Sequence, residues 1–301
     1  MKYGLPQSDA RLRASAVPPP AVPAADFARR EVTVTSKVVT VVITAVLFTA
    51  AKGITGYVPS PWGVGQLYIA SFVPLFFAVV SDTLSVAVGA AMGSFIGDML
   101  FLLPVGATNP LLALAAGVPA NFVATLLFGW AVKRYRSWPS FITSTVVFLT
   151  LGNLMAAGLV ATAGPLLFAP LAPLTSMQGK ALLTLGLTVF WDTTSIPAVL
   201  IVVPVLLRAV RPISARSTVI TDYPAWSSSE ARRIAPMSIL YAFVFLVVAA
   251  VFFLVPWGSS IADITPIKTT IFVVAAILLV VGPLAGRLAG GKSPGRPSAS
   301  A

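Results

Sequence analysis

Long apolar runs and short polar stretches alternate along the whole chain. A helix of about 20 apolar residues rises ~30 Å, which matches the hydrocarbon core of a membrane. Eight runs come near that length, although the second one is shorter. The pattern therefore predicts eight transmembrane helices, at about residues 35–53, 66–80, 83–103, 110–132, 140–162, 181–208, 237–257 and 268–289.

One polar insertion divides these runs into six and two. The stretch "RPISARSTVITDYPAWSSSEARRIAP" follows the sixth run and precedes the seventh. We therefore expect a six-helix membrane core at residues 37–212, a cytoplasmic linker at 213–236 and a two-helix membrane appendage at 237–290. A Pro-rich arm at 1–36 is expected to be disordered in the cytoplasm, and residues 291–301 form a basic cytoplasmic tail.

Composition and charge support the assignment to membrane proteins. Hydrophobic residues make up 57% of the chain and charged residues 10%, against about a quarter charged in a globular domain. Cytoplasmic loops of membrane proteins carry an excess of Lys and Arg. With both termini cytoplasmic, the inner segments hold 17 of the 20 Lys and Arg residues, and the outer segments hold Lys52, Lys180 and Lys268. The charge of +11 is thus explained by topology and anionic lipid headgroups, without nucleic acid. We expect an all-α, multi-pass protein of the cell membrane.

Missing residue types exclude several kinds of chemistry. The chain contains neither Cys nor His, so disulfides, thiol chemistry, the commonest transition-metal ligand and the usual general base are absent. No catalytic dyad or metal-ligand set is evident, and we predict no catalytic residue, metal or cofactor. The sequence "GRLAGGKS" at 286–293 fits a phosphate-binding loop pattern, but it follows a membrane helix rather than a strand. Any ATP used must be hydrolysed by another protein.

A stripe of small residues marks the third run. Ser85, Gly89, Gly93 and Gly97 recur every four residues and so share one helical face. A glycine inside a soluble helix costs about 1 kcal/mol relative to alanine. In lipid, however, small residues at this spacing let a neighbouring backbone approach closely. The stripe predicts close helix packing.

An aspartate follows this stripe directly. Asp98 lies about one turn below the predicted outer surface, where a charge is costly unless it is paired or reaches water. Lys52 lies at similar depth in the first run. Two hypotheses remain open: a structural Lys52–Asp98 pair, or contact of Asp98 with a ligand in an outward-facing pocket. Asp82 differs because it is expected to cap the start of the third helix.

A second group of polar residues lies in runs four to six. Asn121, Asn153 and Asp192 are each about 9 to 11 residues from the outer end of their helix. Polar groups at one depth should face one another or a wet cavity, because facing lipid is costly. This cavity is the predicted substrate site, with Thr188 on the same face as Asp192 and Trp191 as a flat wall. The alternative is a hydrogen-bond cluster that only holds the helices together.

Two outer loops are candidates to close this pocket. Residues 53–68 combine glycines with aromatic residues that include Trp62 and Tyr68, and residues 164–180 form a long Pro-rich loop. Aromatic residues at this level are also typical of the belt at a membrane interface. A lid and an interfacial belt are equally compatible with the pattern.

The passage "KGITGYVPSPWGVGQLYIASFVPLFFAVVSDTLSVAVGAAMGSFIGDML" combines a Gly- and Pro-rich outer loop with the glycine stripe that ends at Gly97 and Asp98. In this passage the core, about residues 37–212, resembles the S components of energy-coupling factor (ECF) transporters, the membrane-embedded substrate-binding subunits that import vitamins and related micronutrients. A cytoplasmic N-terminus and basic residues after runs four and six also fit. The two extra C-terminal runs depart from the family pattern.

The resemblance implies a six-helix fold that binds a small nutrient near the outer leaflet. It also implies a transmembrane coupling subunit and two ATPase subunits as partners. The family docks on its coupling subunit through an A-x-x-x-A pattern in the first helix, for which this chain has Ala45, Thr49 and Gly53. The alternatives are a proton- or sodium-coupled secondary transporter, with Asp192 or Asp98 carrying the ion, and a non-transporting membrane scaffold.

Overall fold

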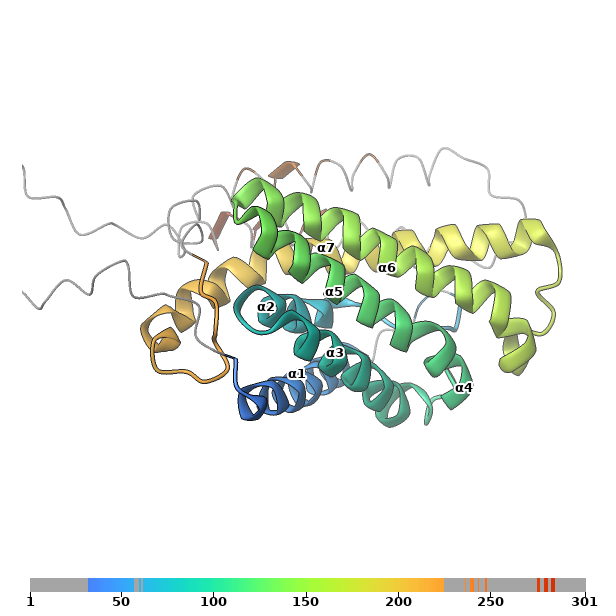
Figure 1. The fold of residues 1–301 in the computed structure, drawn as a ribbon. Coiled ribbons are helices and arrows are strands. Elements are labelled where there is room, and N and C mark those ends of the chain that lie inside the picture. The colour runs from blue at the N-terminus through green and yellow to red at the C-terminus, as the bar shows by residue number, and fades with distance from the viewer. Residues whose placement is uncertain are drawn as a thin grey trace, which may run out of the picture.

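A computed structural model describes residues 32–56, 60, 62–224 and scattered positions between 236 and 284. The regular elements of these residues are helical (Figure 1). They are α1 (Val34–Thr55), η2 (Ile69–Ser71), α2 (Phe72–Val80), α3 (Thr83–Gly97), η3 (Asp98–Leu102), α4 (Pro110–Leu112), η4 (Ala113–Gly117), α5 (Val118–Tyr135), α6 (Trp138–Leu167), η5 (Ala169–Leu171) and α7 (Met177–Ser214).

Within the described part of the chain, five continuous helices are long and apolar enough to cross a membrane. They are Val34–Thr55, Thr83–Leu102, Pro110–Tyr135, Trp138–Leu167 and Met177–Ser214, and the apolar helix Ile69–Val80 is shorter. The all-helical, membrane-embedded character predicted from the sequence is confirmed to this extent. The runs expected at 237–257 and 268–289, residues 1–31 and the tail at 291–301 lie wholly or mostly outside the described residues. Because α1 begins at Val34, the last residues of the arm expected at 1–36 are helical.

Each of the five continuous helices begins after a side chain that accepts a backbone hydrogen bond. Thr33, Asp82, Ser137 and Ser176 cap α1, α3, α6 and α7, Asn109 caps α4 at the start of Pro110–Tyr135, and each accepts the amide hydrogen of the residue three positions later. Such caps satisfy one of the four backbone donors that a helix start leaves unpaired. The expected capping role of Asp82 is confirmed: its Oδ2 accepts from the Ser85 amide at 3.0 Å and from the Ser85 hydroxyl at 2.6 Å.

The two faces of α3 show how the helices are turned. A row of large apolar side chains is exposed, and the adjacent row of small residues is buried against α1. The exposed row consists of Leu84, Val88, Met92, Ile96 and Leu100. Apolar residues outside and small or polar ones inside are expected when the surrounding solvent is lipid.

The glycines of α3 bring it into close contact with α1. A Cβ atom added at Gly89 would lie 2.7 Å from the Val41 carbonyl oxygen, and one at Gly93 would lie 2.7 Å from that of Ala45. One at Gly97 would lie 2.9 Å from Cδ of Lys52. At Gly89 and Gly93, therefore, only glycine allows the observed separation of the two helices, whereas Gly97 makes room for the side chain of Lys52.

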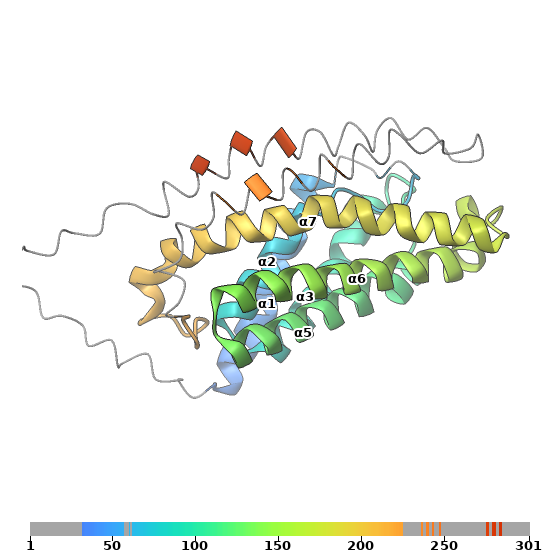
Figure 2. The ribbon, with the colours of Figure 1, turned by 90° about the horizontal axis from the view of Figure 1, so that it is seen from above.

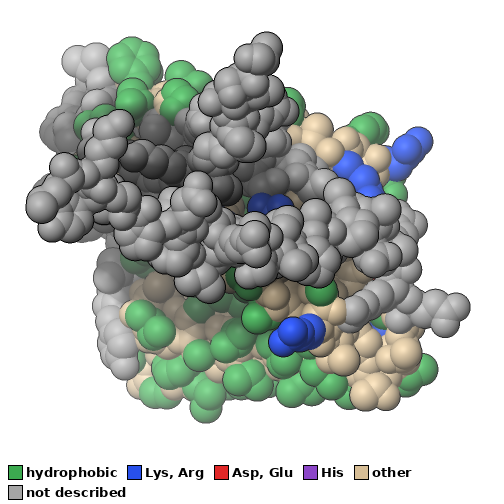
Figure 3. Space-filling view, turned by 90° about the vertical axis from the view of Figure 1, so that its left-hand side faces the viewer, with side chains coloured by type: hydrophobic (Ala, Val, Ile, Leu, Met, Phe, Trp, Pro, Cys, Tyr) green, Lys and Arg blue, Asp and Glu red, His purple; other side chains and the backbone are tan. Residues whose placement is uncertain are grey.

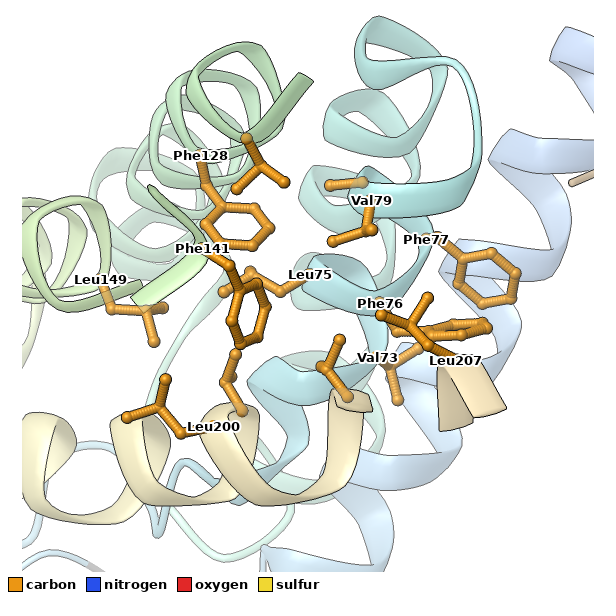
Figure 4. Packing of buried hydrophobic residues seen from close by; sticks show 14 of the residues in the cluster. Val73, Leu75, Phe76, Phe77, Val79, Phe128, Phe141, Leu149, Leu200 and Leu207 are labelled. Carbon is orange, nitrogen blue, oxygen red and sulfur yellow. The ribbon is translucent and has the colours of Figure 1, made fainter. Parts of the chain in front are cut away.

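The short helix α2 lies at the centre of the bundle. The long helices are neighbours in the order α1, α3, α5, α6, α7, and α2 contacts α1, α3, α5 and α7 (Figure 2). Its residues 73–80 are all buried, as expected for a helix that is apolar all round. Figure 4 shows its side chains meeting Phe128 of α5, Phe141 of α6 and Leu207 of α7 in one hydrophobic cluster.

Residues 215–224, the described part of the expected linker, pack against one end of the bundle. The amides of Thr221 and Asp222 donate to the Val80 carbonyl, and the Ser36 hydroxyl donates to the Thr218 carbonyl at 2.6 Å. We call this end, which also carries the α5–α6 turn, the Arg136 end, and the opposite one the Lys52 end. Figure 3 views the Arg136 end, where Lys and Arg side chains stand among hydrophobic ones.

Candidate functional site

A cavity of about 90 Å³ lies inside the half of the bundle toward the Lys52 end. It is bounded by α1, the segment after α1, α3 with η3, η4 with α5, α6 and α7. Its apolar walls are mostly small side chains, among them Ala113, Ala116 and Ala120. Its polar lining is Lys52, Gln66, Tyr68, Ser94, Asp98, Thr108, Asn121 and Asn153. The cavity is large enough for several water molecules.

A buried ion pair forms one wall of this cavity. The Lys52 ammonium donates to Oδ1 of Asp98, and both residues are more than nine-tenths buried. The ammonium also lies 3.2 Å from the Ser94 carbonyl oxygen and 3.5 Å from the Ser94 hydroxyl. The expected Lys52–Asp98 pair is present, and the same two residues face the cavity, so pairing and ligand contact are compatible.

The glycine before Asp98 makes room for this pair. Because Gly97 has no side chain, the Lys52 stem can lie along α3 and bring its charge to the carboxylate one residue later. A buried ion pair needs such supporting geometry, since desolvation of two charges costs several kcal/mol. The last glycine of the stripe thus serves the ion pair as well as helix packing.

Asn121 lines the same cavity and joins three elements. Its carbonyl oxygen accepts from the Tyr68 hydroxyl, and its amide nitrogen donates to the Ser94 hydroxyl at 3.0 Å and to the Gly117 carbonyl at 2.8 Å. A backbone carbonyl can only accept, which fixes the orientation of this amide. The result is a hydrogen-bonded chain from Tyr68 through Asn121 to Ser94 and on to Lys52.

Asn153 and Asp192 form a separate group between α6 and α7. The Asn153 amide nitrogen donates to Oδ1 of Asp192 at 2.7 Å and to the Ser195 hydroxyl at 3.3 Å. The Thr150 hydroxyl donates to Oδ2 of Asp192 at 2.9 Å. Asn153 lines the cavity, whereas Asp192 is not part of the lining. The prediction that Asn121, Asn153 and Asp192 meet in one cavity is therefore correct for the two amides and wrong for the carboxylate.

The reason lies in the helical position of Asp192. It is directed toward α6, where its two oxygens accept one hydrogen bond each from Asn153 and Thr150, and Asn153 separates it from the cavity. Thr188 also stands outside the lining, because its hydroxyl donates to the Thr184 carbonyl of its own helix at 2.7 Å. Sharing one face of an isolated helix does not determine which neighbour that face meets.

The segment after α1 contributes to the cavity through Tyr68 and through contact with Trp191. The indole nitrogen of Trp191 donates to the Gln66 carbonyl at 3.1 Å, and both residues line the cavity. Gly65, at φ +73°, lies against the same ring, where a Cβ would come within 2.7 Å. The expected wall role of Trp191 and the lid position of this segment agree with that geometry.

Trp62 and the second outer loop, residues 164–180, do not border the cavity. The Trp62 ring packs on Gly186 of α7, where an added Cβ would be 2.3 Å away, and Trp62 does not line the cavity. No residue of 164–180 is in the lining either. Of the two expected closing elements, therefore, only the segment around Gly65 and Tyr68 borders the site.

The row of Ala45, Thr49 and Gly53 is covered by α3. Ala45 is 5% exposed, the Thr49 hydroxyl donates to the Gly93 carbonyl at 3.1 Å, and Gly53 lies under the Phe101 ring. Of the two roles expected for this row, the structure shows helix packing. A coupling subunit cannot contact it unless α3 moves, because the space is filled.

The sequence did not single out several residues of the site. Ser94 lies at the junction of the Lys52 and Asn121 bonds, and Gly117 borders both Asp98 and Ser94. Both segments η3 and η4 are π-helical and place residues in the lining. π-Helical turns are rare and frequent at functional sites. The one sequence signal for Gly117 was its position four residues before Asn121, which places both on the same helical face.

Among the described residues, no group of three or more His, Cys, Asp or Glu side chains is placed to hold a metal ion. The chain matches no protein-family model, no curated protein and no solved structure. The proposals below therefore rest on the geometry of the site and on the sequence pattern.

Proposed function

We propose that this protein is the membrane-embedded substrate-binding subunit of an ATP-driven importer of the ECF type, and that the cavity holds its small nutrient. The main support is the cavity itself, which several helices enclose and to which separated parts of the sequence contribute polar groups. If the polar residues only stabilised the helix bundle through hydrogen bonds, no cavity would be needed, because membrane helices associate by close packing of their side chains.

The distribution of charge suggests which way the cavity faces. Lys133, Arg134 and Arg136 lie at the α5–α6 turn, and Arg208 and Arg211 in the last part of α7, all toward the Arg136 end. If the positive-inside rule applies, this end is cytoplasmic and the Lys52 end faces outward. A ligand would then enter from outside, beneath the segment that carries Gly65 and Tyr68.

The ATPase subunits in this proposal are separate proteins. The expected docking row at Ala45 is covered by α3, so a coupling subunit would have to bind another lipid-facing surface, such as the exposed row of α3 from Leu84 to Leu100. The two C-terminal runs expected at 237–290 are a second candidate for partner contact.

The test is to purify the full chain gently from its own membrane and to identify bound small molecules and partner proteins by mass spectrometry. We expect a small molecule in near-stoichiometric amount, together with a coupling subunit and ATPases. Asn153→Ala should lower the amount of small molecule at least tenfold with normal expression, because Asn153 lines the cavity. Gly158→Ala is the matched control on α6, since a Cβ there meets no atom within 4 Å. Absence of both small molecule and ATPase would refute the proposal.

One observation favours a second function, an ion-coupled secondary transporter. The carboxylate of Asp98 reaches the cavity beside Lys52, and ionisable residues inside a membrane commonly mark the path of a coupling ion. Uptake into vesicles separates the two functions. Collapse of uptake by an ionophore, with ATP present, would favour ion coupling, and dependence on ATP without an ion gradient would favour the importer subunit.

A further inference from the structure

We propose that the ligand of this cavity is a small, single-ring nitrogenous cation that donates at least two N–H hydrogen bonds. This inference rests on the proposed binding function and specifies its substrate class. It comes from the hydrogen-bonding atoms of the lining that the protein leaves available to a ligand.

The first available atom is a carboxylate oxygen. Asp98 uses Oδ1 for Lys52, while Oδ2 accepts no hydrogen bond from any described residue. Although Asp98 as a whole is only 7% exposed, its Oδ2 is not fully buried and therefore remains accessible. It borders Gly117, whose absent side chain keeps the space beside it open: an added Cβ would lie 3.3 Å from Oδ2.

The second available atom is an amide oxygen. Asn153 must direct its nitrogen toward Asp192, because a carboxylate only accepts. Its Oδ1 is therefore turned away from Asp192, and it accepts no hydrogen bond from the described residues. Like Oδ2 of Asp98, it keeps access to the cavity. Two acceptors are thus presented from different walls, α3 and α6.

The donors of the lining are mostly engaged. The Lys52 ammonium has three oxygen partners, the amide nitrogens of Asn121 and Asn153 have two each, and the Trp191 indole donates to Gln66. The Ser94 hydroxyl accepts from Lys52 and Asn121, which leaves one hydrogen to donate. An anionic ligand would therefore find few donors, and a ligand with N–H groups would find two strong acceptors.

The charges around the cavity favour the same class of ligand, a nitrogenous cation. Lys52 and Asp98 balance each other, so they leave the cavity with no excess positive charge. The carboxyl group of Asp192 stands directly behind Asn153 and adds negative potential. Tyr68 and Trp191 supply aromatic surface, which attracts a cation more strongly when water is excluded. A cation is therefore favoured over a neutral molecule of equal shape.

The volume sets an upper size. At about 90 Å³ the cavity is well below the roughly 300–1,000 Å³ of sites for drug-sized ligands. One planar ring with amino substituents fits these dimensions, and a ligand of two or more rings requires the Gly65–Tyr68 segment to move. The proposal therefore names protonated amino-heterocycles and amidines of one ring.

The test uses three probes of similar size and different charge against the purified full chain. They are 4-aminopyridine, which is a cation at neutral pH, the neutral aniline and the anion benzoate, each titrated by calorimetry at pH 7. We expect 4-aminopyridine to bind at least tenfold more tightly than aniline, and benzoate to bind more weakly than both. Equal binding of the cation and aniline, or tighter binding of benzoate, would overturn the proposal.

A steric variant connects this preference to Asp98. Gly117→Ala keeps every polar group and places a methyl group 3.3 Å from Oδ2 of Asp98 and 3.4 Å from the Ser94 hydroxyl. We expect at least a tenfold loss of 4-aminopyridine affinity with an unchanged melting temperature. The same substitution at Gly158 should leave the affinity unchanged. Full affinity in Gly117→Ala would contradict the assignment.

The identity of the small molecule that copurifies with the protein tests this inference and the proposed function separately. If the purified protein carries an anionic or uncharged compound, the substrate class is wrong while the binding function stands. If it carries no compound and binds none of the three probes, both proposals fail. A co-purified nitrogenous cation supports both.

Discussion

The two ends of the bundle are built from the same helices and differ in side-chain size. Toward the Arg136 end, Phe76, Phe77, Phe128 and Phe141 fill the space between helices with interlocking rings. Toward the Lys52 end, the same helices carry alanine, glycine and amide side chains, and a cavity remains. Large rings therefore fill the interior toward the Arg136 end, whereas toward the Lys52 end a second hydrophobic cluster, which includes Leu187 and Phe190, leaves part of the interior open.

Small residues themselves act in two opposite ways in this protein. On α3 they let α1 approach until the backbones touch, so that no space is left. On η4 and α5, Ala113, Ala116 and Gly117 face helices that larger residues hold farther away, and the missing side-chain volume becomes a cavity. The effect of a small residue in a membrane helix depends on what keeps the neighbouring helix at its distance.

The largest expected effect comes from overfilling the α1–α3 contact. Gly93→Leu places a side chain where Cβ alone would lie 2.7 Å from a backbone oxygen of α1. Overpacking costs about 1–3 kcal/mol, and more when backbone must shift. We expect loss of monodisperse protein in size-exclusion chromatography, with or without ligand. Gly158→Leu is the control, and a normally folded Gly93→Leu protein would contradict the account of this contact.

A pair of substitutions tests the contrast between the two ends directly. Phe141→Ala at the filled end should lower the free energy of unfolding by about 3–5 kcal/mol, because it opens a void among buried rings. Ala120→Leu at the hollow end should abolish ligand binding and cost about 1 kcal/mol or less, because the added atoms enter existing space. Thermal unfolding and calorimetric binding measure the two effects. The contrast would fail if both variants lost stability equally.

The smallest expected effect is a dependence on acid pH at the start of α3. Burial works to raise the pKa of Asp82, but hydrogen bonds from Ser85 and the charges of Lys133 and Lys37 outweigh it and leave the pKa lowered. A lowered pKa stabilises the fold above the ordinary value of 3.8, and this contribution disappears as the pH falls through the folded-state pKa. Asp82→Asn keeps a good helix cap and removes the charge.

The measurement is the melting temperature of the two proteins between about pH 7 and pH 3. We expect the wild-type protein to lose more stability than Asp82→Asn over the acid part of this range, with a difference much smaller than for the substitutions above. Parallel curves would show that Asp82 does not contribute through its charge.

Much of the helix pattern was predictable from the sequence. The five long helices and the short α2 lie where apolar runs were expected, because helix formation in lipid depends on the local length of such a run. The packing side of α3 was also predictable, since residues spaced by four share a face. The Lys52–Asp98 pair was one of two hypotheses drawn from the similar depth of the two residues, and the structure shows that the helix packed on the glycine stripe is α1.

The composition of the site was predictable only in part. Asn121, Asn153, Trp191, Tyr68 and Asp98 line the cavity as expected. Trp62 and Asp192 do not, because each one meets a neighbour on another segment that no spacing rule identifies, and Thr188 bonds within its own helix. Ser94 was missed, since a serine in a glycine-rich helix carries no signal of its own until two other helices bring Lys52 and Asn121 to it.

Although α6 and α7 extend beyond the expected runs into the loop expected at 164–180, the sequence by itself determined the approximate position of the long described helices, the capping role of Asp82 and the side of α3 that packs. These properties arise from interactions within a few residues along the chain. Only the tertiary structure decided that Asp192 is held behind Asn153, that α3 covers Ala45 and Thr49, and that two π-helical turns meet beside Asp98. Which donor reaches which acceptor depends on the rotation and spacing of helices far apart in sequence, and these are set by the packing of the whole bundle.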